Sequence, residues 1–188
     1  MMKKSMNVYQ LTLVALMTAL ACVLGPLSIP IPISPVPISL TQIPIYLAGY
    51  LLGWKLGTLS YVVYFLLGTI GLPVFSGFSG GLGKVAGPTG GYLIGFIFTA
   101  IVAGYFIEKS GGKVVPSVIG MALGDAFAYL FGTIWLCYLM KIGFLAGLAT
   151  GVLPYLLGDA LKIAACAVIG PVLRKALYRA SGGKLGGK

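Results

Sequence analysis

Residues 68–96 read GTIGLPVFSGFSGGLGKVAGPTGGYLIGF, and this glycine-dense stretch separates the long apolar segments of the chain. Glycine at this density, together with Pro73 and Pro88, excludes the interior of a regular helix or strand. A helical pattern begins directly after Pro88, and we expect Thr89 or a neighbour to cap it, with the free amides facing the loop. The loop is either a flexible connector or a binding loop. Its apolar and aromatic residues favour a binding loop, because they do not suit a solvated linker.

The composition is that of an integral membrane protein. Of the 188 residues, 59% are hydrophobic and 9% are charged, whereas a soluble domain carries about 25% charged residues. The net charge of +10 does not indicate nucleic acid, because the basic residues are scattered over the ends of apolar segments and form no basic stripe. The chain has no histidine, and its three cysteines lie in apolar runs without CxxC spacing, so we expect no metal site and no cofactor.

The apolar segments predict an all-α integral membrane protein with six transmembrane helices in one domain, residues 1–188. The predicted helices cover residues 8–25, 38–53, 56–70, 90–107, 114–140 and 153–173, and a basic, flexible tail begins near residue 175. The first segment could instead be a signal peptide, but no aqueous domain follows that would need export. We expect Pro44 to interrupt the second helix. Residues 26–37 carry five prolines and no charge, which predicts a stiff, extended connector that covers a cavity as a lid.

The basic residues predict the orientation of the chain in the membrane. Six helices put both termini on one side, and that side holds ten of the 13 basic residues. Lys84 and Lys141 lie on the other side, and Lys162 lies within a helix. The positive-inside rule therefore places both termini in the cytoplasm of a multi-pass protein of a prokaryotic cell membrane. Residues 26–37 and 68–96 then share the outer face.

Asp125, Asp159 and Lys162 lie within apolar helices, where a charge costs about 3 kcal/mol even on the lenient insertion scale. Asp159 and Lys162 are three residues apart and share a helix face. This pair either neutralises itself in a structural role or presents an acceptor and a donor to a polar ligand. Asp125 has no local partner, and it either faces Lys162 across the bundle or lies near a helix end.

The sequence contains no catalytic motif that we can identify. An intramembrane aspartyl protease needs a GxGD motif, but the residues before Asp125 and Asp159 read Ala-Leu-Gly and Leu-Leu-Gly. Lys162 would also hold Asp159 ionised, which opposes the shared proton of that chemistry. A phosphate-binding loop ending at Lys84 would need glycine at position 78 and serine or threonine at position 85, and the chain has neither. We therefore predict no enzymatic activity, and uphill transport would draw its energy from a partner or an ion.

Four stretches carry a resemblance to a known family: PVPISL at 35–40, GLPVF at 71–75, GPTGGYLIGF at 87–96 and GDALK at 158–162. Over about residues 8–175 the chain resembles BioY, the biotin-specific membrane subunit (S component) of energy-coupling factor (ECF) transporters. The GPTGGY stretch together with the late GDxxK is the most specific part. The family often reads Leu-Gln-Thr where this chain has Leu40-Thr41-Gln42, and often has proline at the position of Leu157.

The resemblance implies biotin captured at the outer face under the first and third loops, by a six-helix subunit with cytoplasmic termini. It also implies docking onto a transmembrane coupling subunit (EcfT type) with two ATPase subunits (EcfA type), and toppling of the whole S component in the membrane to release its substrate. In this family an alanine pattern on the first helix contacts the coupling subunit, and Ala15 and Ala19 match that pattern. Small residues at this spacing also serve ordinary helix packing.

The chemistry of biotin suits the residues that the resemblance brings together. Lys162 would donate to the ureido carbonyl, and Asp159 would accept from a ureido N–H. Leu72, Phe75 and Tyr92 would line the apolar part. The carboxylate would be held by Lys84 or by the amide-rich helix start after Pro88. The full set of expected binding residues is Asp159, Lys162, Lys84, Gly87, Thr89, Gly90, Tyr92, Leu72, Phe75 and Gln42.

Two other functions are compatible with the sequence. The chain could be the S component for another small vitamin, because the fold is shared within this class and only the site decides the substrate. It could also be a purely structural membrane subunit, a hypothesis that the intramembrane charges oppose.

Overall fold

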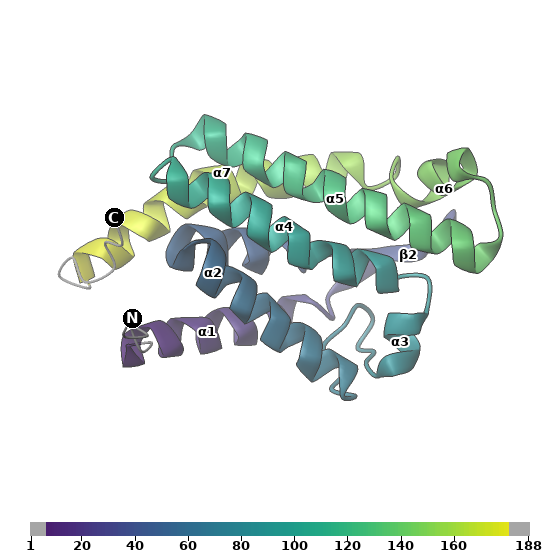
Figure 1. Cartoon of the computed structure of the whole chain (residues 1–188), viewed down its shortest axis with the longest axis horizontal. Coiled ribbons are helices and arrows are strands. Elements are labelled where there is room, and N and C mark those ends of the chain that lie inside the picture. The colour runs from purple at the N-terminus through teal and green to yellow at the C-terminus, as the bar shows by residue number, and fades with distance from the viewer. Residues whose placement is uncertain (1–6, 181–188) are drawn as a thin grey trace, which may run out of the picture.

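The computed structural model describes residues 7–180, which fold as seven helices and one short β-hairpin (Figure 1). The elements are α1 (Val8–Leu24), β1 (Ser28–Ile31), β2 (Ser34–Ser39), α2 (Gln42–Thr69), α3 (Leu82–Ala86), α4 (Gly90–Lys109), α5 (Val114–Met140), α6 (Phe144–Gly151) and α7 (Leu156–Ala180). The start of α1 and the end of α7 lie at one end of the molecule, and α3 and α6 lie at the other (Figure 1). The terminal basic residues Lys3, Lys4, Lys184 and Lys188 lie outside the described residues.

Helix α2 consists of two halves that fold back on each other. At Gly53 the backbone has φ 73° and ψ −174°, a conformation that breaks the helix and that residues with a side chain rarely adopt. The N–H of Trp54, directly after the break, donates to the Glu108 carboxylate at 3.0 Å. A Cβ at Gly57 would lie 3.2 Å from the carbonyl carbon of Ala48, whereas a continuous helix would separate these positions by about 13 Å. The predicted division into two helices near this point is therefore confirmed.

The outer faces of the helices are apolar. Four helices, α2, α4, α5 and α7, are long and apolar enough to cross a membrane, and α1 is a shorter apolar helix. Large hydrophobic side chains stand on their outer surfaces, such as Val168, which is 71% exposed, and Leu66, which is 54% exposed. Apolar surface on this scale requires a cover of lipid or protein. The helical membrane class predicted from the composition is confirmed.

The connector at residues 26–37 forms most of a β-hairpin. Strands β1 and β2 pair in an antiparallel hairpin, with Ser28 opposite Ser39 and an irregular register between Ile29 and Ile31. The prolines are compatible with this extended backbone, since proline is tolerated in edge strands and at bulges. The prediction of an extended segment is confirmed, whereas the pairing of its two halves was not predicted.

Several predicted helix limits were also wrong. Because the second strand extends through Ser39, α2 begins at Gln42 rather than at residue 38. Pro44 lies in the first turn of α2 and does not interrupt it, because the N–H it lacks would have no helical partner there. Helix α7 continues to Ala180, so residues 175–180 are helical and do not belong to a tail. The short helices α3 and α6 were not predicted.

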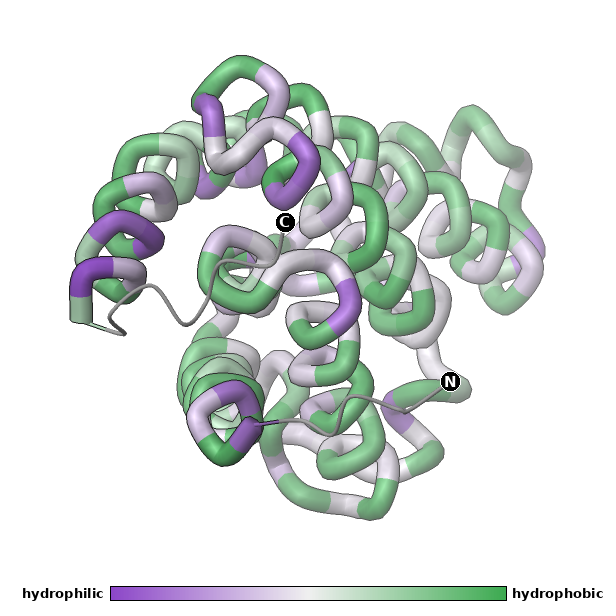
Figure 2. The backbone as a smooth tube through the Cα atoms, turned by 60° about the vertical axis from the view of Figure 1, so that its left-hand side comes forward, coloured by the Kyte–Doolittle hydropathy of each residue, from purple (hydrophilic) through white to green (hydrophobic). Residues whose placement is uncertain are grey.

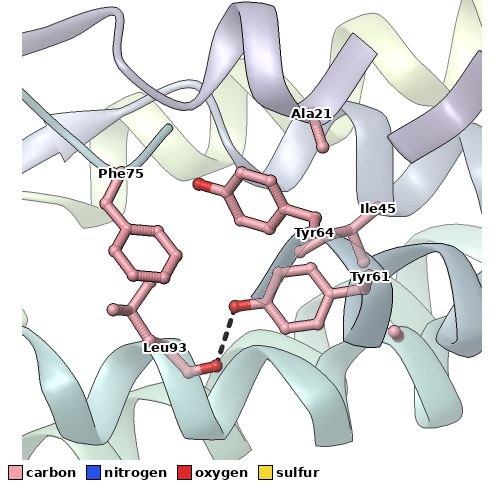
Figure 3. Close-up of a cluster of buried hydrophobic side chains, with 7 residues drawn as sticks. Ala21, Ile45, Tyr61, Tyr64, Phe75 and Leu93 are labelled. Atoms are coloured by element: carbon pink, nitrogen blue, oxygen red, sulfur yellow. Dashed lines mark hydrogen bonds between the residues drawn. The ribbon is translucent and has the colours of Figure 1, made fainter. Parts of the chain in front are cut away.

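The loop between α2 and α4 is anchored by the ring of Phe75. This ring is fully buried and packs in a cluster with Tyr61, Tyr64 and Leu93 (Figure 3). The Tyr64 hydroxyl donates to the carbonyl of Val74 at 2.9 Å, and the Tyr61 hydroxyl donates to the carbonyl of Leu93 at 2.7 Å. These contacts exclude the flexible connector that the sequence left open, because a buried ring and its neighbours hold the loop against the bundle.

Helices α4 and α5 pack through small residues. A Cβ on Gly95 would lie 2.7 Å from the Cα of Ala128, so the two backbones are almost in contact. One helical turn along, the Thr99 hydroxyl donates to the carbonyl of Gly124 at 2.8 Å. Close approach through small residues is the usual means by which helices associate in lipid, where no hydrophobic effect drives them together.

We expect Gly95→Ala to destabilise the protein by about 1–3 kcal/mol, because the added methyl group would force α4 and α5 apart. Thermal unfolding in detergent measures the effect. Gly83→Ala is the matched control, since a Cβ at Gly83 meets no atom within 4 Å. Equal melting temperatures for the two variants would contradict the close packing of α4 on α5.

Candidate ligand-binding site

A cavity lies where β2, α2, α4, α5 and α7 meet. Its empty volume is about 590 Å³, including space open to solvent. It is lined by Val36, Pro37, Ser39, Thr41, Gln42, Ser76, Thr89, Tyr92, Leu93, Phe96, Ala128, Tyr129, Gly151, Tyr155, Asp159 and Lys162. The wall is therefore mostly apolar or aromatic, with its charged groups gathered on the first two turns of α7.

The charged part of the wall is the ion pair of Asp159 and Lys162. The Lys162 ammonium lies 2.8 Å from Asp159 Oδ1, and both side chains are only 8% exposed. The ammonium also donates to Gln42 Oε1 at 2.6 Å. The second carboxylate oxygen of Asp159 accepts a hydrogen bond from the Tyr129 hydroxyl. Each charge is thus both paired and hydrogen-bonded, which is the condition for burying it.

Asp125 is connected to this pair through Gln42. The amide nitrogen of Gln42 donates to Asp125 Oδ1 at 3.4 Å, and the Tyr46 hydroxyl donates to the same oxygen at 2.5 Å. The orientation of the Gln42 amide follows from its neighbours, since a flipped amide would place its NH₂ against the ammonium and its oxygen against the carboxylate. Asp125 is 3% exposed and does not line the cavity. Asp125 therefore influences the cavity indirectly, because it holds the orientation of the Gln42 amide.

The β-hairpin covers the cavity and is held down from the opposite side. The Tyr155 hydroxyl, between α6 and α7, contacts Ser34 Oγ at 2.6 Å and donates to the carbonyl of Val36. Burial raises the pKa of Tyr155, so the phenol stays protonated and remains a donor. Nearby, the Tyr92 hydroxyl donates to the carbonyl of Gly151 at 2.8 Å. These bonds tie residues 34–36 and the start of α4 to the segment that enters α7.

Comparison with known proteins identifies the family. The model of the BioY family matches residues 1–179 of this chain. The chain belongs to the BioY family. A probable biotin transporter BioY from Pyrococcus horikoshii is 38% identical over 164 residues, covering 87% of this chain and 95% of the relative. The biotin transporter BioY from Lactococcus lactis subsp. cremoris is 38% identical over 182 residues, covering 93% of this chain and 95% of the relative.

A solved structure has the same fold. The crystal structure of the S-component for biotin from an ECF-type ABC transporter superimposes with a TM-score of 0.84 at 38% identity, covering 93% of this chain and 95% of the other. Both curated relatives above are named as transporters rather than enzymes. Family membership and the apolar helices together make this chain an integral membrane protein of the cell membrane.

Five of the binding residues expected for this BioY-family chain line the cavity: Gln42, Thr89, Tyr92, Asp159 and Lys162. The glycines of the same motif lie beside it. Gly90 is buried at the start of α4, and the carbonyl of Gly87 accepts from the indole of Trp135 at 2.9 Å. Thr89 is the N-cap residue of α4, as expected, but its hydroxyl contacts the carbonyl of Lys84 at 3.5 Å and caps no amide of α4.

The other three expected residues lie away from the cavity. Phe75 belongs to the buried aromatic cluster of Figure 3, and Leu72 is 44% exposed on the loop. Lys84 lies on α3 and is not among the lining residues. Burial lowers the pKa of its ammonium from the usual value.

Sequence reasoning missed several lining residues, above all Tyr129 and Tyr155. Tyr129 follows Asp125 by four positions on α5, so both stand on one helix face. A phenol within an apolar helix needs a hydrogen-bond partner, which was the available signal for its role. Its partner Asp159 lies 30 positions further along the chain, and nothing in the local sequence indicates that pairing.

We expect Asp125→Leu to lower the stability by about 1–3 kcal/mol, because it leaves the Tyr46 hydroxyl and the Gln42 amide without their buried acceptor. Asp125→Asn keeps an acceptor oxygen at this position, so its loss of stability should be much smaller. The melting temperatures of both variants in detergent measure this difference in stability. If the asparagine variant melted as early as the leucine variant, the negative charge rather than the hydrogen bonds would be the stabilising feature.

Proposed function

We propose that this chain is the biotin-binding S component of an ECF transporter, a binding subunit without catalytic activity. The observation that carries the proposal is the buried Asp159–Lys162 pair in the wall of a covered cavity. The family relatives are named biotin transporters, and the solved relative is the S-component for biotin of such a transporter. Biotin would enter from the outer face and leave toward the cytoplasm.

The ion pair can still form hydrogen bonds with a ureido ring. The Lys162 ammonium has three N–H donors, and two of them are used by Asp159 and Gln42. The Asp159 carboxylate has about four lone-pair positions and accepts from Lys162 and Tyr129. Lys162 would donate its third N–H to the ureido carbonyl, and Asp159 would accept from a ureido N–H. Binding would not require the pair to separate, so the site is organised before biotin arrives.

The apolar wall of the cavity and the start of α4 suit the thioether ring, the alkyl chain and the carboxylate of biotin. Val36, Leu93 and Phe96 offer an apolar wall for the thioether ring and the alkyl chain. The first turn of α4, beginning after Thr89, presents helix amides and the positive end of the helix dipole. We assign the biotin carboxylate to this turn rather than to Lys84, which lies off the cavity.

For the topology we propose six membrane passes: α1, the two halves of α2, α4, α5 and α7. Both termini would be cytoplasmic, in keeping with the excess of basic residues at that end. Ala15 and Ala19 stand on the exposed face of α1, opposite the buried Leu13 and Met17. They are available to a transmembrane coupling subunit (EcfT type), with lipid around the remaining surface. Two ATPase subunits (EcfA type) would supply the energy.

Asp159→Asn and Lys162→Ala should each weaken biotin binding more than tenfold, about 1.4 kcal/mol, because each removes one partner of the ureido ring. Calorimetry on the purified chain in detergent measures the affinities. Lys84→Ala is the matched control and should bind biotin as the native chain does.

The three possible results lead to different conclusions. Tight binding that only the two pair variants weaken supports both substrate and site. If biotin binds tightly and no variant changes the affinity, the Asp159–Lys162 pair has a structural role. Absence of binding at micromolar protein contradicts the biotin proposal, and then other small vitamins are the next ligands to test.

Tyr155→Phe should make biotin dissociate several-fold faster, because each hydrogen bond from the hydroxyl to the β-hairpin stabilises the closed form by about 1 kcal/mol. Release of labelled biotin from the purified chain measures the rate. Tyr138→Phe, at a residue that is 78% exposed on α5, should leave the rate unchanged. Identical rates for the two variants would show that the hairpin does not retain the ligand.

A further inference from the structure

A second concave site lies at the opposite end of α7 from the cavity. It is a groove between the last turns of α7 and the turn joining α4 to α5, with an empty volume of about 580 Å³ including space open to solvent. Its cations are Arg174, Lys175 and Arg179, and its floor includes Gly111 and Gly112. Figure 2 shows hydrophilic stretches both at the end of α7 and in the turn after α4, at this end of the molecule.

The helix geometry gathers the cations on one side. Positions 171, 174, 175, 178 and 179 follow the pattern i, i+3, i+4, i+7, i+8, so they share a face of α7. Arg174 is held against the turn, where its guanidinium donates to the carbonyl of Ile107 at 3.3 Å. A Cβ on Gly112 would lie 3.2 Å from Arg174 Cδ, so only glycine permits this packing without a shift. The groove is therefore built by contacts between separate elements.

In the described part of the chain, none of the acidic side chains forms an ion pair with these cations. The whole chain has three acidic residues. Asp125 and Asp159 belong to the cavity network, and Glu108 accepts from the N–H of Trp54. Within residues 7–180, the one ion pair is that of Lys162 with Asp159. Three neighbouring positive charges that form no ion pair repel each other and attract an anion.

The surroundings of the groove indicate the kind of anion. Beside the groove, α7 carries exposed apolar side chains: Val168, one turn before Pro171, is 71% exposed, and Val172, between the lining residues Pro171 and Arg174, is 64% exposed. The cations begin where this lipid-facing surface ends, which is the depth of phospholipid headgroups. Tyr178 lines the groove at the same level, and tyrosine is enriched at this interface. A soluble anion would not need an apolar wall beside its site.

We propose that this groove binds the phosphate of an anionic phospholipid headgroup, with Lys175 and Arg179 as its cations beside the anchored Arg174. The acyl chains lie along the exposed apolar face of α7. The lipid phosphate thereby offsets part of the positive charge of the groove. This inference does not depend on biotin as the substrate.

The test compares lipid binding to the full chain in neutral detergent by native mass spectrometry. The chain is titrated with phosphatidylglycerol and with phosphatidylcholine that has the same acyl chains. Lys175→Gln/Arg179→Gln removes two cations of the groove. Lys109→Gln/Lys113→Gln is the matched control, because it removes the same charge from exposed positions on the same turn that do not line the groove.

We expect the native chain to prefer phosphatidylglycerol. The groove variant should lose that preference by roughly 25-fold, since each of its two basic residues near a membrane surface contributes about fivefold in affinity. The control pair should keep the preference, because neither residue lines the groove. Unchanged melting temperatures and biotin affinity for both variants would show that the fold and the cavity are intact.

Three results would overturn the proposal. A native chain without a preference has no such site. An equal loss in both variants would assign the effect to general charge attraction rather than to the groove. Displacement of phosphatidylglycerol by millimolar inorganic phosphate would identify the groove as a site for a soluble phosphate.

Discussion

The interior of this bundle depends on the contacts of one group, the ammonium of Lys162. It is the one basic group in the network that also holds Asp125 and Asp159, and it contacts Asp159 directly and Asp125 through Gln42. A lone charge at this depth would oppose membrane insertion, and burying an ion pair is tolerable only when its remaining hydrogen-bonding groups are satisfied. The network therefore requires α2, α5 and α7 to meet within hydrogen-bonding distance, and this requirement constrains how the helices pack.

The backbone packing that meets this requirement comes largely from glycine. Helix α2 reverses at Gly53, which returns the chain along its own first half and leaves Gln42 facing the bundle interior. Gly95 and its neighbours bring α4 onto α5, which places Tyr92 and Tyr129 in one cavity wall. The same small residues that permit close helix contact in lipid thus determine the dimensions of the site. The β-hairpin then covers the cavity, because Tyr155 binds residues 34–36 from the side of α7.

The site was predicted best where its residues lie close together in the sequence. The spacing of Asp159 and Lys162 was sufficient to predict their contact, because three positions on a helix bring two side chains to one face. Prediction was poor in the part of the loop that precedes α3. Leu72 and Phe75 were expected at the ligand because they are apolar, but one lies on the surface and the other packs in the buried aromatic cluster. Apolar character does not show which of several apolar surroundings a side chain joins.

Local sequence alone determined the membrane class, the apolar segments, the ion pair and the resemblance to the BioY family. These properties depend on composition, on helical spacing and on short contiguous motifs, all of which act over a few residues. Only the tertiary structure decided that Asp125 reaches Lys162 through Gln42, that Tyr129 binds Asp159, and that Lys84 lies off the cavity. The reason is that these contacts depend on the rotation and crossing of separate helices. That arrangement is a property of the packed bundle as a whole, and no single segment encodes it.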